Sequence, residues 1–256
     1  MFRIIKTRIQ QRYRTMKYPD GPPPELPARF TGRPVISEST CRNNGCNLCI
    51  AECPVKAISV NPETKGPVID TGRCIFCRSC ERICPEGILH FGREYRLATS
   101  TRHDLLIQAG EPDHRTARNE IAVKLFKRSL KLRQVSAGGC NACEADTNVL
   151  GTLAWDMGRF GIQFVASPRH ADGVLITGPV TENMHEALLK TYRALPDPKV
   201  VIATGSCAIS GGPYAGHPEQ NNGAVDIVPV DLFIPGCPPH PLTILDGLLR
   251  FTGRID

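Results

Sequence analysis

The feature that most limits how this chain can fold is its set of twelve cysteines, eight of which fall in two runs of similar spacing. These runs are Cys41-x4-Cys46-x2-Cys49-x3-Cys53-Pro54 and Cys74-x2-Cys77-x2-Cys80-x3-Cys84-Pro85. In such a run the first three thiolates bind one 4Fe-4S cluster, and the fourth, before proline, binds the neighbouring cluster. The spacing therefore predicts one cluster on Cys41, Cys46, Cys49 and Cys84, and a second on Cys53, Cys74, Cys77 and Cys80.

The two runs form an internal repeat about 33 residues apart, and each continues into a similar hydrophobic segment, PVKAISV or PEGILHF. This arrangement resembles the bacterial two-cluster ferredoxin domain, so we expect an α+β ferredoxin-like domain at residues 36–92. Paired zinc sites are the alternative, because CxxC pairs also suit tetrahedral zinc. We prefer clusters, since zinc modules have no use for cysteines that exchange between two sites. The first run has four residues, 42–45, where two are usual, which predicts a longer loop and a more exposed or shifted first cluster.

The remaining cysteines, which are Cys140, Cys143, Cys207 and Cys237, lie in the second half and follow β-type segments. Strands are expected at 133–137, 162–167, 171–177, 199–205 and 224–230, and helices at 144–160, 182–195 and 242–251. Such alternation is typical of a parallel sheet covered on both faces. Loops beyond the carboxyl ends of its strands build the sites of open α/β folds, and four soft thiolates there suit a third 4Fe-4S cluster. For Cys207 taken alone a buried thiol is the alternative, but that alternative does not account for all four, since every cysteine of this half is used.

Basic residues are concentrated outside the cysteine regions of this chain, whose net charge is +6. Residues 1–40 contain eight Lys and Arg against three Asp and Glu, and residues 93–133 contain ten against five. Apolar residues spaced by three and four predict a basic amphipathic helix at 2–16 and a second helix at 119–132, within a linker at 93–133. The proline-rich segment after the first helix predicts an extended strap to residue 35. We expect these segments either to contact an acidic protein surface or anionic lipid headgroups, or to be solvated. Aromatic residues are too sparse among them to indicate nucleic-acid binding.

The sequence predicts no transmembrane helix, because its longest uncharged stretch, Val200 to Gly216, is interrupted by glycines and a proline. The N-terminus has neither the apolar core nor the cleavage site of a signal peptide. We therefore expect a cytoplasmic protein, in which cysteines bind metal rather than form disulfides.

Three motifs of the second half identify a family: CxxC at Cys140, GxCAxxGG at Gly205 and PGCPP at Pro235. Together they resemble the small subunit of energy-converting membrane-bound nickel-iron hydrogenases of the formate hydrogenlyase type, and the homologous 20 kDa cluster-bearing subunit of respiratory complex I. The resemblance runs from about Ser129 to Phe251 and implies an α/β flavodoxin-like domain at residues 134–256. Complex I proteins have two adjacent cysteines where this chain has Cys140-x2-Cys143, which favours the hydrogenase branch.

The first half resembles the two-cluster ferredoxin subunit of the same complexes, including RFTGRPV before the first cysteine and REYRLATSTRHDLLI after the last. Two subunits that are normally separate are therefore expected to be fused here. The resemblance implies an electron-transfer subunit of an oxidoreductase complex, with three 4Fe-4S clusters and no catalytic residue of its own. The expected partners are a large catalytic subunit, membrane-arm subunits and a soluble electron donor or acceptor, on the inner face of the membrane.

Two other functions remain open at this point. One is the equivalent subunit of a complex I-like quinone reductase or of a nickel-free relative, and the other is a free polyferredoxin that carries electrons. Glu144 and Asp146 follow Cys143 and are candidates either for proton transfer or for stabilising the start of the next helix. Arg169 and His170 are candidates for hydrogen bonding around a cluster, or for ordinary surface.

Overall fold

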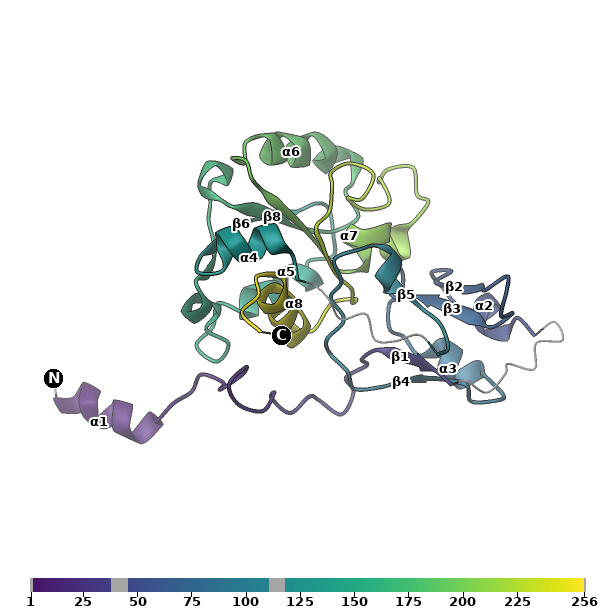
Figure 1. The fold of residues 1–256 in the computed structure, drawn as a ribbon, viewed down its shortest axis with the longest axis horizontal. Helices are drawn as coiled ribbons and strands as arrows, with labels where there is room; N and C mark the ends of the chain where they lie inside the picture. The colour runs from purple at the N-terminus through teal and green to yellow at the C-terminus, as the bar shows by residue number, and fades with distance from the viewer. Residues whose placement is uncertain (1, 38–45, 111–117, 256) are drawn as a thin grey trace.

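The computed structural model describes residues 2–37, 46–110 and 118–255. Its larger part contains a five-stranded sheet in which every pair of neighbours is parallel, in the order β10-β9-β8-β6-β7 (Figure 1). The strands are β6 (Leu130–Ser136), β7 (Ile162–Phe164), β8 (Gly173–Thr177), β9 (Val200–Thr204) and β10 (Leu232–Ile234). The prediction of an α/β domain with a parallel sheet is thus confirmed.

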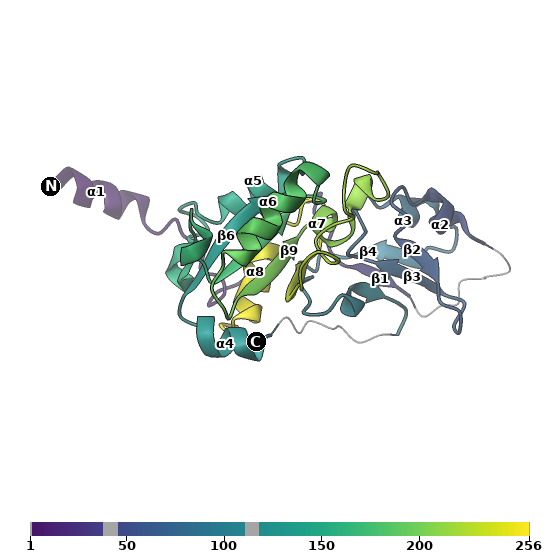
Figure 2. The same ribbon diagram turned by 90° about the horizontal axis from the view of Figure 1, so that it is seen from above.

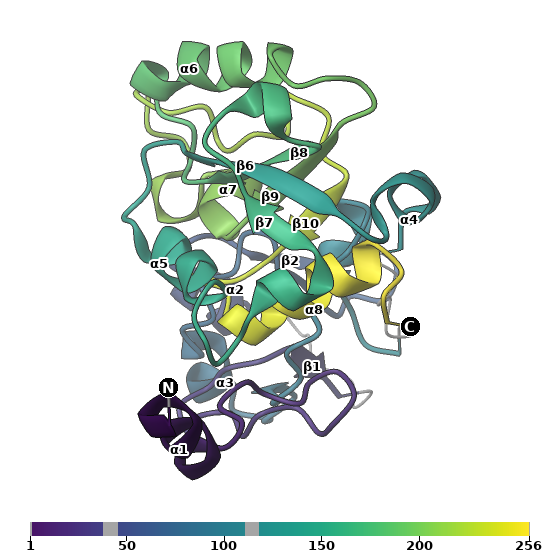
Figure 3. The same ribbon diagram turned by 90° about the vertical axis from the view of Figure 1, so that its left-hand side faces the viewer.

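Helices cover both faces of this sheet (Figure 3). They are α5 (Ala142–Val149), α6 (Glu182–Arg193), α7 (Ser206–Ser210) and α8 (Pro241–Phe251). Successive strand residues point to opposite faces, so Leu175 of β8 packs in one core with α8, whereas Val174 and Ile176 pack in another core with Leu188 of α6. Burial on both faces explains why β8 and β9 are continuous apolar runs rather than alternating ones.

A smaller part, whose described residues contain seven of the first eight cysteines, lies to one side of the sheet (Figure 2). Its antiparallel sheets pair β1 (Pro34–Ile36) with β4 (Leu89–Phe91), and β3 (Pro67–Asp70) with both β2 (Ile58–Val60) and β5 (Leu106–Ile107). Two short helices, α2 (Leu48–Glu52) and α3 (Ser79–Ile83), each begin one residue before the third cysteine of a run and end one residue before the fourth. The repeat seen in the sequence therefore corresponds to a repeat in the structure.

The predicted helix at 119–132 is wrong in its second half. Helix α4 (Glu120–Phe126) ends early, and Leu130 and Leu132 belong to β6. These two leucines are fully buried whereas Lys131 between them is exposed, which is the two-residue period of a strand.

Two further elements differ from the sequence prediction. The strand expected at 224–230 is wrong, because these residues form turns and the strand of this region is β10. Pro229 has no N–H for a ladder and restricts the residue before it. The helix expected at 144–160 is replaced by α5, a series of turns and the 3-10 helix η2 (Met157–Phe160).

An extended strap joins the N-terminal helix to the smaller part and is anchored on the larger one. The buried Tyr18 hydroxyl donates to the Asp246 carboxylate of α8 at 2.6 Å. Arg159 donates to the backbone carbonyls of Met16 and Tyr18, at 2.6 and 2.5 Å. Ahead of the strap, α1 (Phe2–Gln11) buries none of its side chains and extends away from the body (Figures 1 and 2).

The two parts share a close contact. Thr99 and Phe233 of β10 form an isolated antiparallel bridge, with N–H to carbonyl distances of 3.0 and 2.9 Å. Leu105, from the 3-10 helix η1 (His103–Leu105), is fully buried in the core beneath α6 and α7. Other 3-10 helices are η3 (Pro168–His170) and η4 (Gly212–Tyr214). No helix in the described ranges is long and apolar enough to cross a membrane.

Candidate metal centres

The four cysteines of the second half meet at one edge of the parallel sheet. Cys140 and Cys143 follow β6, Cys207 lies in the first turn of α7 after β9, and Cys237 follows β10. The thiols are close enough to interact electrostatically: Cys143 interacts with Cys207, Cys237 and Cys140, and Cys207 interacts with Cys237 and Cys140. The structure thus brings together the four residues that the sequence predicts as one ligand set.

Burial raises the pKa of three of these thiols, those of Cys143, Cys207 and Cys237, and so favours their neutral form. The pKa of Cys207 is raised to about 12, first by burial and then by the neighbouring thiols. Burial also raises the pKa values of Cys143 and Cys237. Because thiolate is the form that binds metal, a cation must displace these protons when it binds. Four soft sulfurs in one half-buried group fit an iron-sulfur cluster.

Glycines leave room around these sulfurs. Gly205, between β9 and α7, has a φ of +88°, and a Cβ added to it would lie 2.5 Å from the Cys143 sulfur. A Cβ added to Gly212 would lie 2.9 Å from the Cys207 sulfur. Only glycine avoids both the strained backbone and the steric clash at Gly205.

Glu144 is buried directly beside this cysteine group. Its carboxylate accepts hydrogen bonds from the Ser136 hydroxyl at 2.5 Å and from the Thr177 hydroxyl at 2.6 Å. These donors lie at the carboxyl ends of β6 and β8, so Glu144 ties the start of α5 to the sheet. Its negative charge also acts on Cys143 and Cys207, raising the pKa of both thiols.

The other candidate polar residues are placed differently. Asp146 is half-buried, lines a cavity with Cys237 and His240, and has its pKa raised by burial. Arg169 and His170 are exposed on η3, in the connection that leads to the start of β8 rather than to the cysteine edge. The structure does not bring these last two residues to the four cysteines, and their role around a cluster stays a prediction.

The cysteines assigned to the second cluster line one apolar cavity in the smaller part. They are Cys53, Cys74, Cys77 and Cys80, and Cys53 comes from the other run. Burial and then neighbouring thiols, Cys53 among them, raise the pKa of Cys80 to about 11. Two backbone amides donate to sulfur, from Ala57 to Cys53 at 3.2 Å and from Phe76 to Cys74 at 3.3 Å. The chain therefore places Cys53 with the second run, as the spacing predicts.

The set assigned to the first cluster is described only in part. Cys49 and Cys84 are half-buried and pack against one apolar core with Ile36 and Ile88, and Cys46 is exposed. Cys41 and the loop at 42–45 lie outside the described residues. Within the described ranges, no three His, Cys, Asp or Glu side chains are placed to hold a metal ion.

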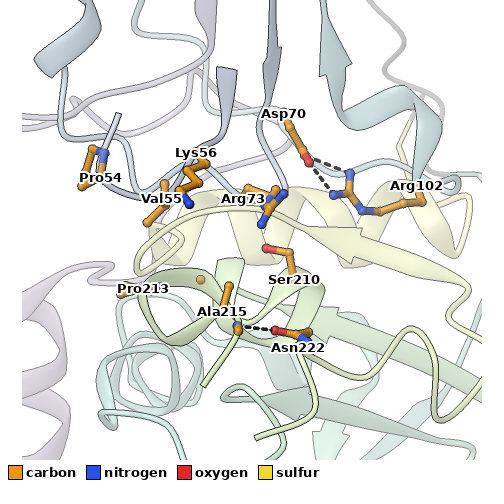
Figure 4. Close-up of a pocket in the computed structure, with 12 residues that line it drawn as sticks. Pro54, Val55, Lys56, Asp70, Arg73, Arg102, Ser210, Pro213, Ala215 and Asn222 are labelled. Carbon is orange, nitrogen blue, oxygen red and sulfur yellow. Dashed lines mark hydrogen bonds and ion pairs between the residues drawn. The ribbon is translucent and has the colours of Figure 1, made fainter. Parts of the chain in front are cut away.

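The loop at 72–76 of the smaller part contacts α7 of the larger part, and we call this contact the seam. The Ser206 hydroxyl donates to the Cys74 carbonyl at 2.6 Å, and the Ser210 hydroxyl donates to the Gly72 carbonyl at 2.9 Å. Beside Ser210 a pocket opens (Figure 4), in which Asp70 is paired with Arg102. Sequence reasoning missed both serines, because their partners are 132 and 138 residues away along the chain.

Comparison with known proteins gives two family matches. Residues 140–251 match the family described as NADH ubiquinone oxidoreductase, 20 Kd subunit, and residues 33–88 match the family described as 4Fe-4S dicluster domain. Neither match alone spans half of the chain, and together they include every cysteine.

Three relatives illustrate the range of similar proteins. The probable membrane-bound hydrogenase subunit mbhJ of Pyrococcus furiosus is 43% identical over 49% of this chain and 75% of its own length. Formate hydrogenlyase subunit 7 of Escherichia coli is 42% identical over 52% of each chain. A subunit of the NADH-quinone oxidoreductase of Heliobacterium modesticaldum is 40% identical over 46% of this chain and 69% of its own length.

Proposed function

Because the chain belongs to the family of the 20 kDa subunit of NADH ubiquinone oxidoreductase, we propose that it is the electron-transfer subunit of a membrane-bound, hydrogenase-type oxidoreductase complex. The observation on which this proposal depends is the convergence of four cysteines at the carboxyl edge of the parallel sheet. Together with the dicluster match at 33–88, it supports a chain that holds iron-sulfur clusters in both of its parts.

We propose three 4Fe-4S clusters. The ligands would be Cys140, Cys143, Cys207 and Cys237 for the third cluster, Cys53, Cys74, Cys77 and Cys80 for the second, and Cys41, Cys46, Cys49 and Cys84 for the first. When bound, each cluster would supply a one-electron carrier. In this proposal residues 36–92 form a ferredoxin-like domain and residues 134–256 form a flavodoxin-like domain. The two short helices between antiparallel strands support the first assignment, and the parallel sheet covered by helices supports the second.

The residues around the sulfurs would tune these carriers. The amides of Ala57 and Phe76 donate to cysteine sulfurs, and such donors stabilise the more reduced, more negative form of a cluster. The buried Glu144 acts in the opposite direction at the third site, because a negative charge disfavours reduction.

The catalytic centre of the complex belongs, in this proposal, to a large partner subunit. The Cys140-x2-Cys143 spacing favours a hydrogenase of the formate hydrogenlyase type, and the similarity to a subunit of NADH-quinone oxidoreductase supports a quinone reductase as the second candidate. A free polyferredoxin is disfavoured, since a soluble carrier would not need a covered α/β half with one cluster at its edge.

We propose that the chain sits on the inner face of a membrane through its complex. Helix α1 supports this placement, because Phe2, Ile5 and Ile9 are more than half exposed and lie beside Arg3, Lys6 and Arg8. Basic amphipathic helices of this kind bind the headgroup region of anionic membranes or the surface of membrane subunits.

The test is metal and sulfide analysis of the complex purified without oxygen, with nickel measured beside iron. Three clusters require about twelve irons and as many sulfides per chain, after those of the partner subunits are subtracted. About one nickel per complex would support the hydrogenase, and its absence would favour the quinone reductase. Zinc in place of iron would refute the proposal.

A further inference from the structure

Ser206 occupies a position at the seam that no ligand assignment explains. It is only 1% exposed, and it directly precedes Cys207 in the first turn of α7. Its hydroxyl oxygen lies 2.6 Å from the Cys74 carbonyl oxygen and 3.1 Å from the Gly236 carbonyl oxygen. One buried hydroxyl therefore lies within reach of residues from both the second and the third cysteine sets.

The single hydroxyl proton can serve only one of these carbonyls at a time. Gly236 already accepts the Ser206 backbone N–H at 2.8 Å, and the Cys74 carbonyl is the nearer acceptor for the hydroxyl. The proton is therefore donated to Cys74. The backbone and side chain of Ser206 together join three cysteine loops: that of Cys207 by the chain itself, that of Cys237 through Gly236, and that of Cys74 through the hydroxyl.

The packing around Ser206 keeps water from replacing this hydrogen bond. Cys74 is itself 8% exposed. Gly72 lies so close to α7 that an added Cβ would come within 2.9 Å of Ile209, and Leu105 fills the adjacent core. A carbonyl that loses its donor in such a place stays unsatisfied, because the group is already desolvated.

Ser210 provides a natural comparison one turn later on α7. Its hydroxyl also crosses the seam, to Gly72 at 2.9 Å, but it lies 3.1 Å from the Ser206 carbonyl of its own helix as well. Ser210 is partly exposed and borders the pocket of Figure 4. Its bond can thus be exchanged for one within the helix or to water, and neither Ser210 nor Gly72 adjoins a cysteine.

We propose that Ser206 is a positioning residue, whose hydroxyl fixes the separation and orientation of the second and third cysteine sets. The inference depends on the proposed function, since it concerns the spacing of two cluster sites within one chain. With the loops fixed, the coupling between the two sites is set by this chain alone, before any partner subunit binds.

The experiment compares Ser206→Ala with Ser210→Ala in the cluster-loaded full chain. The first readout is the magnetic interaction between the reduced clusters in electron paramagnetic resonance, which depends on their distance and orientation. The second readout is hydrogen exchange at the Thr99 and Phe233 amides, which form the bridge between the smaller and the larger part. An unsatisfied buried carbonyl should increase opening of the seam about tenfold, and exchange should accelerate by the same factor.

We expect Ser206→Ala to weaken the interaction and accelerate exchange, Ser210→Ala to leave the interaction unchanged, and Ser206→Thr, which keeps the hydroxyl, to restore both readouts. Wild-type splitting and exchange in a fully loaded Ser206→Ala chain would overturn the inference. If the Ser206→Ala chain does not bind clusters, the Ser206→Thr chain provides the test. Cluster binding by Ser206→Thr with the wild-type splitting of the resonance spectrum supports the inference, and loss of that splitting or of the clusters overturns it. Absence of clusters from the wild-type chain would instead refute the proposed function.

Discussion

Replacing Gly205 by alanine should remove the proposed third cluster, and the structure gives the size of the effect. The backbone of Gly205 has φ +88° and ψ +153°, a region almost confined to glycine, so alanine costs about 1–3 kcal/mol in strain. The added Cβ would lie 2.5 Å from the Cys143 sulfur, whereas an ordinary contact is about 3.5–4.0 Å. The sulfur must therefore move by about 1 Å, several times the roughly 0.2 Å that a metal-ligand bond tolerates.

The assay is iron and acid-labile sulfide per chain, with the electron paramagnetic resonance spectrum of the reduced protein. Gly205→Ala should lose about four of roughly twelve irons and the signal of one cluster. Gly216→Ala is the matched control, since Gly216 has a similar φ of +83° but an added Cβ there meets nothing within 4 Å. Full iron and wild-type signals in Gly205→Ala, or equal loss in both variants, would refute the reasoning.

Two further predictions concern His240, at the start of α8, and helix α1. Burial lowers the pKa of His240, whose ring meets the only tryptophan, Trp155, edge-on at 6.1 Å. The folded chain favours the neutral form of His240. The contribution of this histidine to the free energy of unfolding is therefore present above about pH 6.5 and is lost as the pH falls through the lowered pKa. Tryptophan fluorescence should change in this acid range, and His240→Gln should abolish that change. Replacing the basic residues of α1, which are Arg3, Lys6 and Arg8, by glutamine should weaken binding to vesicles that contain anionic lipid by about 1 kcal/mol per charge, as measured by co-sedimentation. The replacement should not change binding to neutral vesicles. Equal binding of the unchanged chain to both vesicle types would contradict the membrane placement.

Cysteine spacing predicted which cysteines lie close together, and the assignment of these groups to clusters stays a proposal. The position of Cys53 before a proline, at the end of its run, predicts that it lies with Cys74, Cys77 and Cys80. In the structure these four cysteines line one cavity. The convergence of the second-half cysteines followed in the same way from strands that share one carboxyl edge.

Tertiary features were not accessible in this way. Leu130 and Leu132 fit a helix continued from α4 as well as a strand, and pairing with β7 and β8 decides between these alternatives. Residues 224–230 include β-branched side chains, which gives them a high strand propensity. This propensity takes no account of Pro229, which has no backbone N–H to donate to a neighbouring strand. The sequence around Ser206 does not indicate its role, because the carbonyl that accepts its hydrogen bond, that of Cys74, lies 132 residues away in the chain.

The anchoring of the strap has a consequence for how the chain is made. The Tyr18 hydroxyl donates to the Asp246 carboxylate, which is 228 residues later in the chain. A ribosome adds about 5–20 residues each second, so the strap must wait roughly 10–45 seconds after its own synthesis for its anchor to appear. Because Arg29 and Phe30 of the strap border the cavity beside Cys237, the anchored strap can cover this side of the molecule only after all twelve cysteines have been translated.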